Sequence, residues 1–372
     1  MSESSKTLYL HIGIGKTGTT ALQEFWASNA DQLVSLGVKY ASTGFDQGAH
    51  HILGHYWGVG WMQKQAVDQE ISSGGDHWLK LSEEFRSSSD HLLVSTESLA
   101  RAFSERPESL VDIKTKLAGV NIKFLIYLRR QDLHVESWYN QLIKTGLSSD
   151  HFRPFEQTPS FYDYYALLTS ISTVFGHSSV IVRAYEKNQF FGKSIYQDAS
   201  KALGLGWHEG FEIPKRDPNP RIDLKTLEFL RQANESDLNW QHKYEFNNKV
   251  IHSVAAYQAG SCDDVLMDLN ERKAFLARYE QSNRMVAIEF MSREDGQLFY
   301  DALESEGAKQ STEDYELSVA NAVEVTLAIW QQMNRENYLL RQQLSENSRY
   351  SLTPLLRKIK KLFVSNQEGA GD

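Results

Sequence analysis

The chain has 372 residues, 41% hydrophobic and 23% charged, which suits a soluble globular protein with one large domain and an appendage, or with two domains. Lysine and arginine total 39 against 48 acidic residues, and this net charge of −9 disfavours a non-specific nucleic-acid binder. The single cysteine, Cys262, excludes an internal disulfide framework and suggests no cysteine-based metal site. No apolar stretch has the length of a signal peptide or a membrane span, so we expect a cytoplasmic protein.

The strongest local pattern covers residues 8–23, which read LYLHIGIGKTGTTALQ. It predicts a buried strand, a glycine-rich turn and the start of a helix. Glycines let backbone N–H groups converge, the helix N-terminus adds a partial positive charge, and Lys16 adds a full one. A tight turn that merely needs glycine is the alternative, but three glycines, a lysine and three threonines exceed that need. We therefore predict a cradle for a phosphate or sulfonate.

A loop over residues 43–61 follows a short predicted strand and is rich in glycine, histidine and aromatic residues. Zinc is one interpretation of His50, His51 and His55, but no carboxylate at H-E-x-x-H spacing accompanies them. We expect no metal here and prefer a wall of the substrate cleft.

Further buried strands are predicted at residues 90–95, at 122–128 and from Val180, with helices between them. This alternation predicts a three-layer α/β/α fold with a central parallel sheet, followed by a mostly helical C-terminal region. The predicted domains are 5–302, with an α/β core to about 213 and a helical part over 214–302, and a helical extension over 303–372.

Apolar residues recur at steps of three and four between Glu313 and about Ser345, which predicts helix. Asn337 interrupts the stripe, so a short pair of helices fits better than a long coiled coil, and a homodimer through this region is an expectation. Residues 352–364 mix leucines with lysines and arginines. Such a basic tail suits either contact with an anionic membrane surface or a solvated helix.

A second anion-binding motif follows the strand at 122–128. Arg129 ends that strand, and Ser137 lies eight residues later in the next helix. A guanidinium grips phosphate with a fork of donors, and a hydroxyl adds a neutral donor. The alternative is that Arg129 pairs with a surface carboxylate, which the glycine loop earlier in the chain makes less attractive.

Together the two motifs resemble sulfotransferases that use 3′-phosphoadenosine 5′-phosphosulfate (PAPS), in particular a bacterial carbohydrate-type group. Their 5′-phosphosulfate loop, K-[TS]-G-[TS]-T, matches residues 16–20. Of their R-N-P-x-x-R-x-x-S-x-Y motif, Arg129, Ser137 and Tyr139 are present, whereas His134 replaces the middle arginine. The N-P pair is also absent. Softer similarity extends the resemblance over about residues 7–300.

The resemblance implies PAPS as sulfuryl donor, 3′-phosphoadenosine 5′-phosphate (PAP) as product, and no metal. It implies a P-loop-like fold in which both ends of the donor meet one sheet edge. The cofactor-binding residues it carries over are the loop residues Gly15, Lys16, Thr17, Gly18, Thr19 and Thr20, and the 3′-phosphate pair Arg129 and Ser137.

In-line sulfuryl transfer also needs a general base and a cation at the leaving phosphate. We assign Lys16 as the cation. Glu97 is the first choice for the base, because it follows a strand at the edge where ligands of parallel sheets bind. His50 and His51 are its rivals, since an ordinary histidine pKa already suits the task. A helix-capping acid is the alternative role for Glu97.

The predicted acceptor is a hydroxyl of a polysaccharide, oligosaccharide or glycolipid, which the sequence does not identify further. A P-loop kinase or nucleoside triphosphatase is the first competing function. Its motif G-x-x-x-x-G-K-[ST] would need a glycine at Leu10, and no later strand ends in a clear magnesium-binding acid. The second is a scaffold that binds nucleotide without turnover and is indifferent to Glu97→Ala.

Overall fold

The computed structural model describes residues 6–57, 76–156, 162–214, 222–255, 266–303 and 317–365. The chain forms two compact units that interleave along the sequence. The first comprises Met1–Gln141, His151–Pro220 and Asp264–Glu313, and the second Leu142–Asp150, Arg221–Asp263 and Asp314–Asp372. The predicted domains are two continuous stretches that meet at residue 302, whereas each unit is assembled from three separate segments. The predicted division is of a different kind and stays a prediction.

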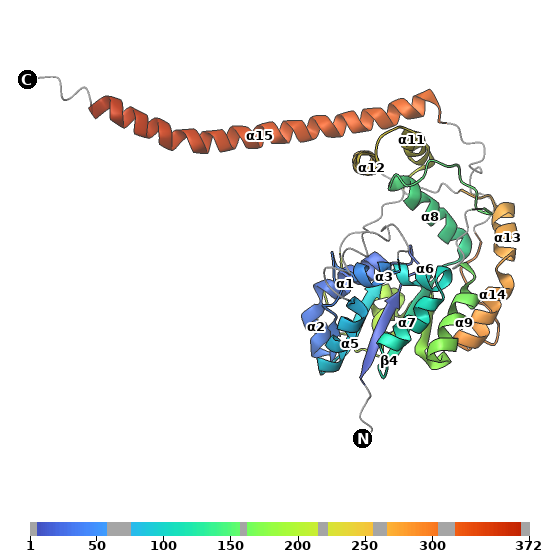
Figure 1. Ribbon diagram of the computed structural model, residues 1–372. Helices are drawn as coiled ribbons and strands as arrows, with labels where there is room; N and C mark the ends of the chain where they lie inside the picture. Colours follow the sequence, from blue (N-terminus) through green and yellow to red (C-terminus); the bar gives the residue numbers. More distant parts are fainter. Residues whose placement is uncertain are drawn as a thin grey trace, which may run out of the picture. The chain divides into compact units, whose positions relative to one another are not determined.

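The first unit is built on a five-stranded sheet in the order β2-β3-β1-β4-β5, with every pair of neighbours parallel. Figure 1 shows helices packed around this sheet, with β4 labelled. The strands are β1 Thr7–Ile12, β2 Val38–Tyr40, β3 His91–Thr96, β4 Asn121–Leu128 and β5 Val180–Ala184. Because all strands run the same way, their carboxyl ends share one edge. The predicted α/β class with a parallel sheet is confirmed.

Helices connect and cover these strands. They are α1 Thr19–Ser28, α2 Ala30–Ser35, α3 His51–His55, α5 His77–Ser87, α6 Ser98–Glu105, α7 Glu108–Lys116, α8 Gln131–Lys144, α9 Tyr164–Phe175, α10 Ile195–Ala202, α13 Leu269–Ala277 and α14 Glu280–Met285, with short turns of helix at His177–Ser179, Phe191–Lys193 and Val286–Phe290. Helices α1, α2 and α10 contribute to the core on one face. On the other face α6 packs on the sheet through Phe103 and Phe124, and α7 and α9 pack beside it.

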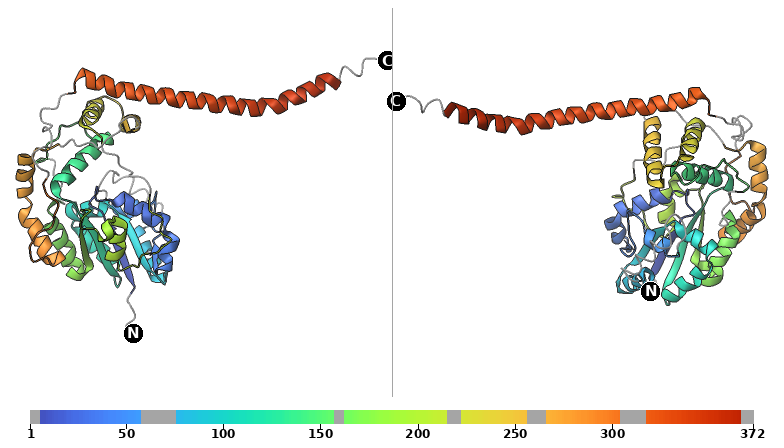
Figure 2. Two further views of the ribbon diagram at one scale, coloured as in Figure 1. Left: turned by 180° about the vertical axis from the view of Figure 1, so that it is seen from behind. Right: turned by 45° about the horizontal axis from the view of Figure 1, so that its top comes forward.

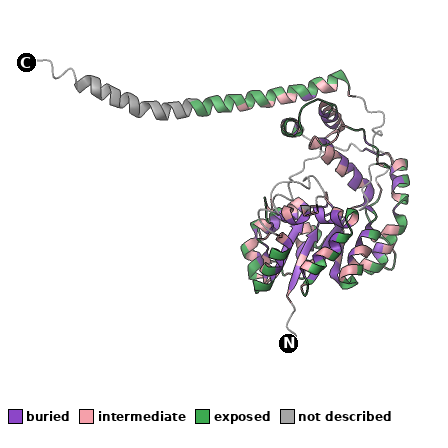
Figure 3. Ribbon diagram, viewed as in Figure 1, coloured by how far each residue is buried: buried purple, intermediate pink, exposed green. Residues whose placement is uncertain are grey.

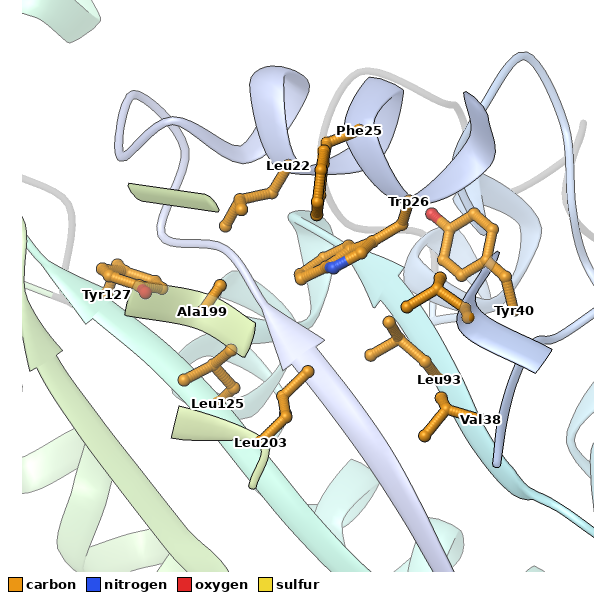
Figure 4. Packing of buried hydrophobic residues seen from close by; sticks show 11 residues of the cluster. Leu22, Phe25, Trp26, Val38, Tyr40, Leu93, Leu125, Tyr127, Ala199 and Leu203 are labelled. Atoms are coloured by element: carbon orange, nitrogen blue, oxygen red, sulfur yellow. The ribbon is translucent and has the colours of Figure 1, made fainter. Parts of the chain in front are cut away.

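The central strand β1 is buried on both faces, which explains its nearly continuous apolar sequence. Leu8, Leu10 and Ile12 are fully buried on one side. On the other side Trp26 of α1 packs with Leu93 and other residues of the sheet, as Figure 4 shows. The core therefore holds the end of β1, and with it the glycine loop, in a fixed place.

The second unit is helical. It contains α11 Leu224–Asn234, α12 Trp240–Ala255 and α15 Val319–Ser365. The predicted pair of short helices is wrong: α15 is one continuous helix of 47 residues (Figure 2). Asn337 does not end it, because asparagine inside a helix is disfavoured by only about 0.7 kcal/mol relative to alanine. No helix in the described part of the chain combines the length and the apolar character that crossing a membrane requires.

Two buried histidines brace the sheet near its carboxyl edge. His11 of β1 shares a 2.8 Å hydrogen bond between Nδ1 and the Ser95 hydroxyl. His50 accepts from the Ser95 N–H at Nδ1 (3.1 Å) and donates from Nε2 to the Ala41 carbonyl (2.8 Å). Burial lowers the pKa of His11 to about 3 and the pKa of His50 to about 4. Both rings are therefore neutral in the folded protein near pH 7.

These two histidines predict a loss of stability in mild acid. Because their folded pKa values lie below the unfolded value of about 6.5, the unfolded chain takes up the protons first. Stability is fully present above pH 6.5 and falls below it, by about 1–2 kcal/mol per histidine between pH 7 and 5. Urea denaturation at several pH values measures the slope. His50→Gln should flatten it, whereas exposed His252→Gln should not; equal slopes for all three proteins would contradict the assignment.

Candidate functional site

The glycine loop joins β1 to α1 at the carboxyl edge of the sheet. Gly18 is the N-cap of α1 and adopts a left-handed conformation, with φ of 75°. Gly15 and Lys16 are also left-handed, with φ of 51° and 57°. A lysine in this region is uncommon and costs energy, so its surroundings must hold it there. Such strain concentrates at functional sites.

Two of the glycines are also required by packing. A Cβ on Gly13 would lie 1.9 Å from Cγ2 of Thr19. A Cβ on Gly18 would lie 2.5 Å from Cδ1 of Ile195 and 2.9 Å from Cε2 of Tyr185. The loop is therefore tightly enclosed on these sides, and its backbone path admits no side chain there.

One carbonyl group of the loop is bound by a side chain. Arg129 donates from Nη1 to the Lys16 carbonyl at 2.9 Å. The Ile14 and Gly15 backbone also lies close enough to His134 to raise the pKa of its ring, against the larger effect of burial. In a trans peptide the N–H points opposite to the C=O, so the N–H group of Thr17 is directed away from Arg129. Among the described residues that N–H group has no backbone hydrogen-bond partner, as an anion cradle requires.

The His134 ring also connects the loop to the strand that carries Arg129. Its Nδ1 lies 3.1 Å from the hydroxyl of Tyr164, and that hydroxyl donates to the Arg129 carbonyl at 2.6 Å. Burial lowers the pKa of His134 to about 3, so the ring is neutral near pH 7. His134 thus provides a neutral brace beside the loop, and no further cation.

Glu97 follows β3, the strand beside β1, and reaches the loop directly. Its Oε2 accepts a 3.0 Å hydrogen bond from the Thr19 hydroxyl, and the Gly13 N–H donates to the Thr96 carbonyl at 3.2 Å. Glu97 is the N-cap residue of α6, yet its side chain makes no capping hydrogen bond. Its geometry therefore fits a group of the site better than a capping acid.

Arg129 follows β4 on the other side of β1. Within the described residues its guanidinium makes one hydrogen bond, to Lys16, and its Nε is buried without a partner. The Tyr185 ring lies 5.8 Å from the guanidinium carbon. Burial lowers the pKa of Arg129 below its ordinary value, although the group stays charged at pH 7. No surface carboxylate of the described residues pairs with it, contrary to the alternative role.

Helix α8 lies next to the loop. Gln141 accepts a 3.1 Å hydrogen bond from the Lys16 ammonium, and the Trp138 ring lies 3.8 Å from where a Cβ on Gly15 would be. Ser137 is half-buried, and its hydroxyl has no partner within the part of the chain that the structure describes. Neither Gln141 nor Trp138 belongs to the two anion-binding motifs, so only the folded chain shows that they lie beside the loop.

Four buried charges fix the start of α8 beside Arg129. Asp132 accepts from Nε of Arg130 at 2.8 Å and from Nη1 of Arg272 at 2.6 Å. Arg272 also donates from Nη2 to Glu136 at 2.8 Å. Burial alone would raise the pKa of Asp132, but the two arginines lower it overall. Removing one member would leave a buried charge uncompensated, so the cluster makes the helix position rigid.

The three histidines of the predicted cleft wall have different surroundings. His50 is fully buried and uses both ring nitrogens on backbone groups, which gives it a structural role and no nitrogen for a substrate proton. His51 is half-buried at the first residue of α3. The side chain of His55 lies outside the described residues. Among the side chains that the structure describes, no group of three or more His, Cys, Asp or Glu could hold a metal ion.

The start of α1 changes the comparison with the triphosphatase motif. Four residues separate Gly13 from Gly18, as in G-x-x-x-x-G-K-[ST], and helix α1 begins directly after Gly18. Aligning Gly15, Lys16 and Thr17 with the end of the motif instead puts its first glycine at Leu10. In the register of the helix, Thr19 stands where that motif has lysine, and Lys16 lies inside the loop instead.

Comparisons with known proteins add little. No family model matches the sequence. An uncharacterized protein from Archaeoglobus fulgidus is 30% identical over 171 residues, and the match spans 45% of each chain, less than half of that protein's length. The crystal structure of a sulfotransferase from Alicyclobacillus acidocaldarius aligns with 64% of this chain and 99% of its own, at 14% identity. Its TM-score of 0.34 is too low to support an argument about fold or function.

The enclosure of Gly18 predicts a large effect of a single methyl group. Gly18→Ala should lower the free energy of unfolding by about 1–3 kcal/mol more than Gly37→Ala does. Gly37 has nearly the same φ, 77° against 75°, but nothing lies within 4 Å of its Cβ position. The pair therefore separates packing from backbone strain. Urea denaturation of both variants measures the difference, and equal losses would show that Ile195 and Tyr185 do not confine the loop.

Proposed function

We propose that the chain is a sulfotransferase that moves the sulfuryl group of PAPS to a hydroxyl of a carbohydrate acceptor. The observation that carries this proposal is the 2.9 Å hydrogen bond from Arg129 to the Lys16 carbonyl. It joins two anion-binding groups from neighbouring strands, the loop after β1 and the guanidinium after β4. A donor with separate 5′ and 3′ phosphates needs two such groups, whereas a single polyphosphate chain needs one cradle and a magnesium site.

The buried polar atoms of the site suit this donor. Thr17 is fully buried, and its hydroxyl has no hydrogen-bond partner among the described residues. The Nε atom of Arg129 is also buried and also has no partner among them. Buried donors without partners are costly unless a ligand supplies acceptors. The proposed roles are those of the two motifs. The loop from Gly15 to Thr20 binds the 5′-phosphosulfate, and Arg129 with Ser137 binds the 3′-phosphate.

The proposed reaction is an in-line displacement at sulfur. The acceptor oxygen forms a bond to sulfur, the bond from sulfur to the 5′-phosphate oxygen breaks, and PAP leaves with that electron pair. Lys16 neutralises charge on the leaving phosphate. Glu97 takes the acceptor proton; Thr19 occupies its Oε2, which leaves Oε1 for this purpose. His51 remains the rival base, because His50 has no ring nitrogen to spare.

The acceptor and its location rest on the sequence resemblance. A polysaccharide, oligosaccharide or glycolipid hydroxyl is the proposed acceptor, and a cytoplasmic protein that touches the membrane surface is the proposed setting. The backbone of the basic tail, residues 352–364, is helical as part of α15, but its side chains lie outside the described residues. Membrane contact therefore stays a prediction.

Selective binding of PAP tests the donor. PAP at about a hundred times its dissociation constant should stabilise the protein by about 2.7 kcal/mol, measured as a thermal shift beside ADP and ATP with magnesium. Arg129→Ala should remove the response, whereas Arg101→Ala should keep it, because Arg101 pairs with Glu105 away from the loop. Stabilisation by ATP with magnesium alone would favour a kinase. No response to any nucleotide would contradict both enzymes.

Substitution of Glu97 tests the base. Glu97→Gln keeps an acceptor oxygen for Thr19 but cannot take a proton, so turnover should fall about 10²–10⁴-fold while PAP binding is retained. Transfer of labelled sulfate from PAPS to a panel of polysaccharides and glycolipids measures turnover. Glu105→Gln, on the surface of α6, is the matched control. Normal turnover in Glu97→Gln together with a large loss in His51→Gln would transfer the role to His51.

A further inference from the structure

Eight exposed positions of α15 form a regularly spaced stripe, and the exposed apolar residues Leu327, Tyr338 and Leu339 lie outside it. Its eight positions are separated by alternating steps of four and three residues, and all eight are exposed. Figure 3 shows that the described part of α15 is mostly exposed. Six of them are apolar, with between 48% and 82% of the residue accessible. The stripe consists of Val319, Val323, Thr326, Trp330, Met333, Asn337, Leu340 and Leu344. None of the eight is charged.

The second unit uses a different face of the same helix. Val325, which lies between two stripe residues in sequence, is 2% exposed where α15 packs on α11 and α12. On that face Lys225 pairs with Glu324 at 2.5 Å, and Lys249 pairs with Glu336. Val325, Glu324 and Glu336 are not stripe residues, and the eight stripe positions stay exposed beside these contacts.

The spacing indicates what that molecule is. Steps of four and three average 3.5 residues, whereas a straight α-helix has 3.6 residues per turn. A strict 3.5-residue repeat is the pattern of a helix that supercoils around another helix with the same repeat, with the alternating positions as a and d. A helix lying on a membrane needs no such repeat. A second copy of α15 supplies the matching repeat without any further assumption.

Polar residues specify the arrangement of the two copies. With Val323 and Trp330 at a positions, Asn337 also falls at a position a, where a single asparagine is best satisfied by its own counterpart in a parallel, two-stranded coil. An antiparallel pair would place Asn337 against an apolar d residue. Asn337, which interrupts the apolar pattern of the stripe, therefore fits as the residue that fixes the register of the two helices.

We propose that two copies of this chain associate through a parallel, in-register coiled coil formed by residues 319–344 of α15. The proposal does not depend on the reaction that the first unit performs, since none of its observations involves the loop or Arg129. The stripe covers 26 residues, which is about 39 Å of helix at 1.5 Å per residue. Apolar side chains at a and d positions flank Asn337 on both sides: Met333 precedes it, and Leu340 and Leu344 follow it.

Sedimentation of the full chain tests association. The native protein at micromolar concentration should sediment at twice the 42.5 kDa of one chain. Leu340→Glu should shift it to the monomer, because it places a charge in the seam, whereas Leu339→Glu should leave the dimer intact. These neighbours have similar exposure, 55% and 49%, and differ in the face they occupy. A native monomer, or equal effects of the two variants, would overturn the proposal.

Cross-linking tests the orientation. In a Cys262→Ser background, Asn337→Cys should form a disulfide between two chains under mild oxidation, because a positions of a parallel in-register pair meet at the axis. Leu339→Cys should not form it. A dimer that persists in sedimentation without a cross-link from Asn337→Cys would overturn the parallel register. A monomer that binds vesicles of anionic lipid through α15 would overturn the dimer and favour a membrane.

Discussion

The hydrogen bond from Arg129 to the Lys16 carbonyl is the interaction on which the site depends. It holds a lysine backbone in a left-handed conformation that lysine does not favour by itself. By binding the carbonyl it also fixes the direction of the following N–H, that of Thr17. The same contact places a guanidinium from one strand against a loop from the next. One hydrogen bond therefore sets the backbone conformation of Lys16, the direction of the Thr17 N–H and the position of the Arg129 charge.

This contact is possible because β3, β1 and β4 are adjacent and parallel. Glu97, the loop and Arg129 follow those three strands in that spatial order. In the sequence, Glu97 lies 78 residues after Thr19 of the loop, and Arg129 lies 113 residues after Lys16. A parallel sheet brings all three to one edge without any local sequence relation between them. The buried core under β1 keeps their spacing constant, because side chains packed at this density move little.

Much of this arrangement could be predicted, since it depends on local patterns. The alternation of apolar strands and helices predicts the parallel sheet, and the glycine-rich turn predicts the cradle. The role of His50 could not be predicted, because its partners, Ala41 and Ser95, are backbone groups that only the folded chain brings to it. Asn337 was misjudged for a related reason. In the sequence, a polar residue within an apolar stripe indicates the end of a helix. The structure shows that the helix continues through Asn337.

Arg129 and Arg130 show why adjacent identical residues need the structure to be told apart. Arg130 is buried against Asp132, so its charge is compensated within the protein. Arg129 is buried at Nε with no carboxylate partner among the described residues, and burial lowers the pKa of its guanidinium because it disfavours the charged form. A phosphate bound beside Arg129, as we propose, would compensate this charge. Its binding energy would then add to the stability of the folded protein, so stability and anion affinity would depend on the same side chain.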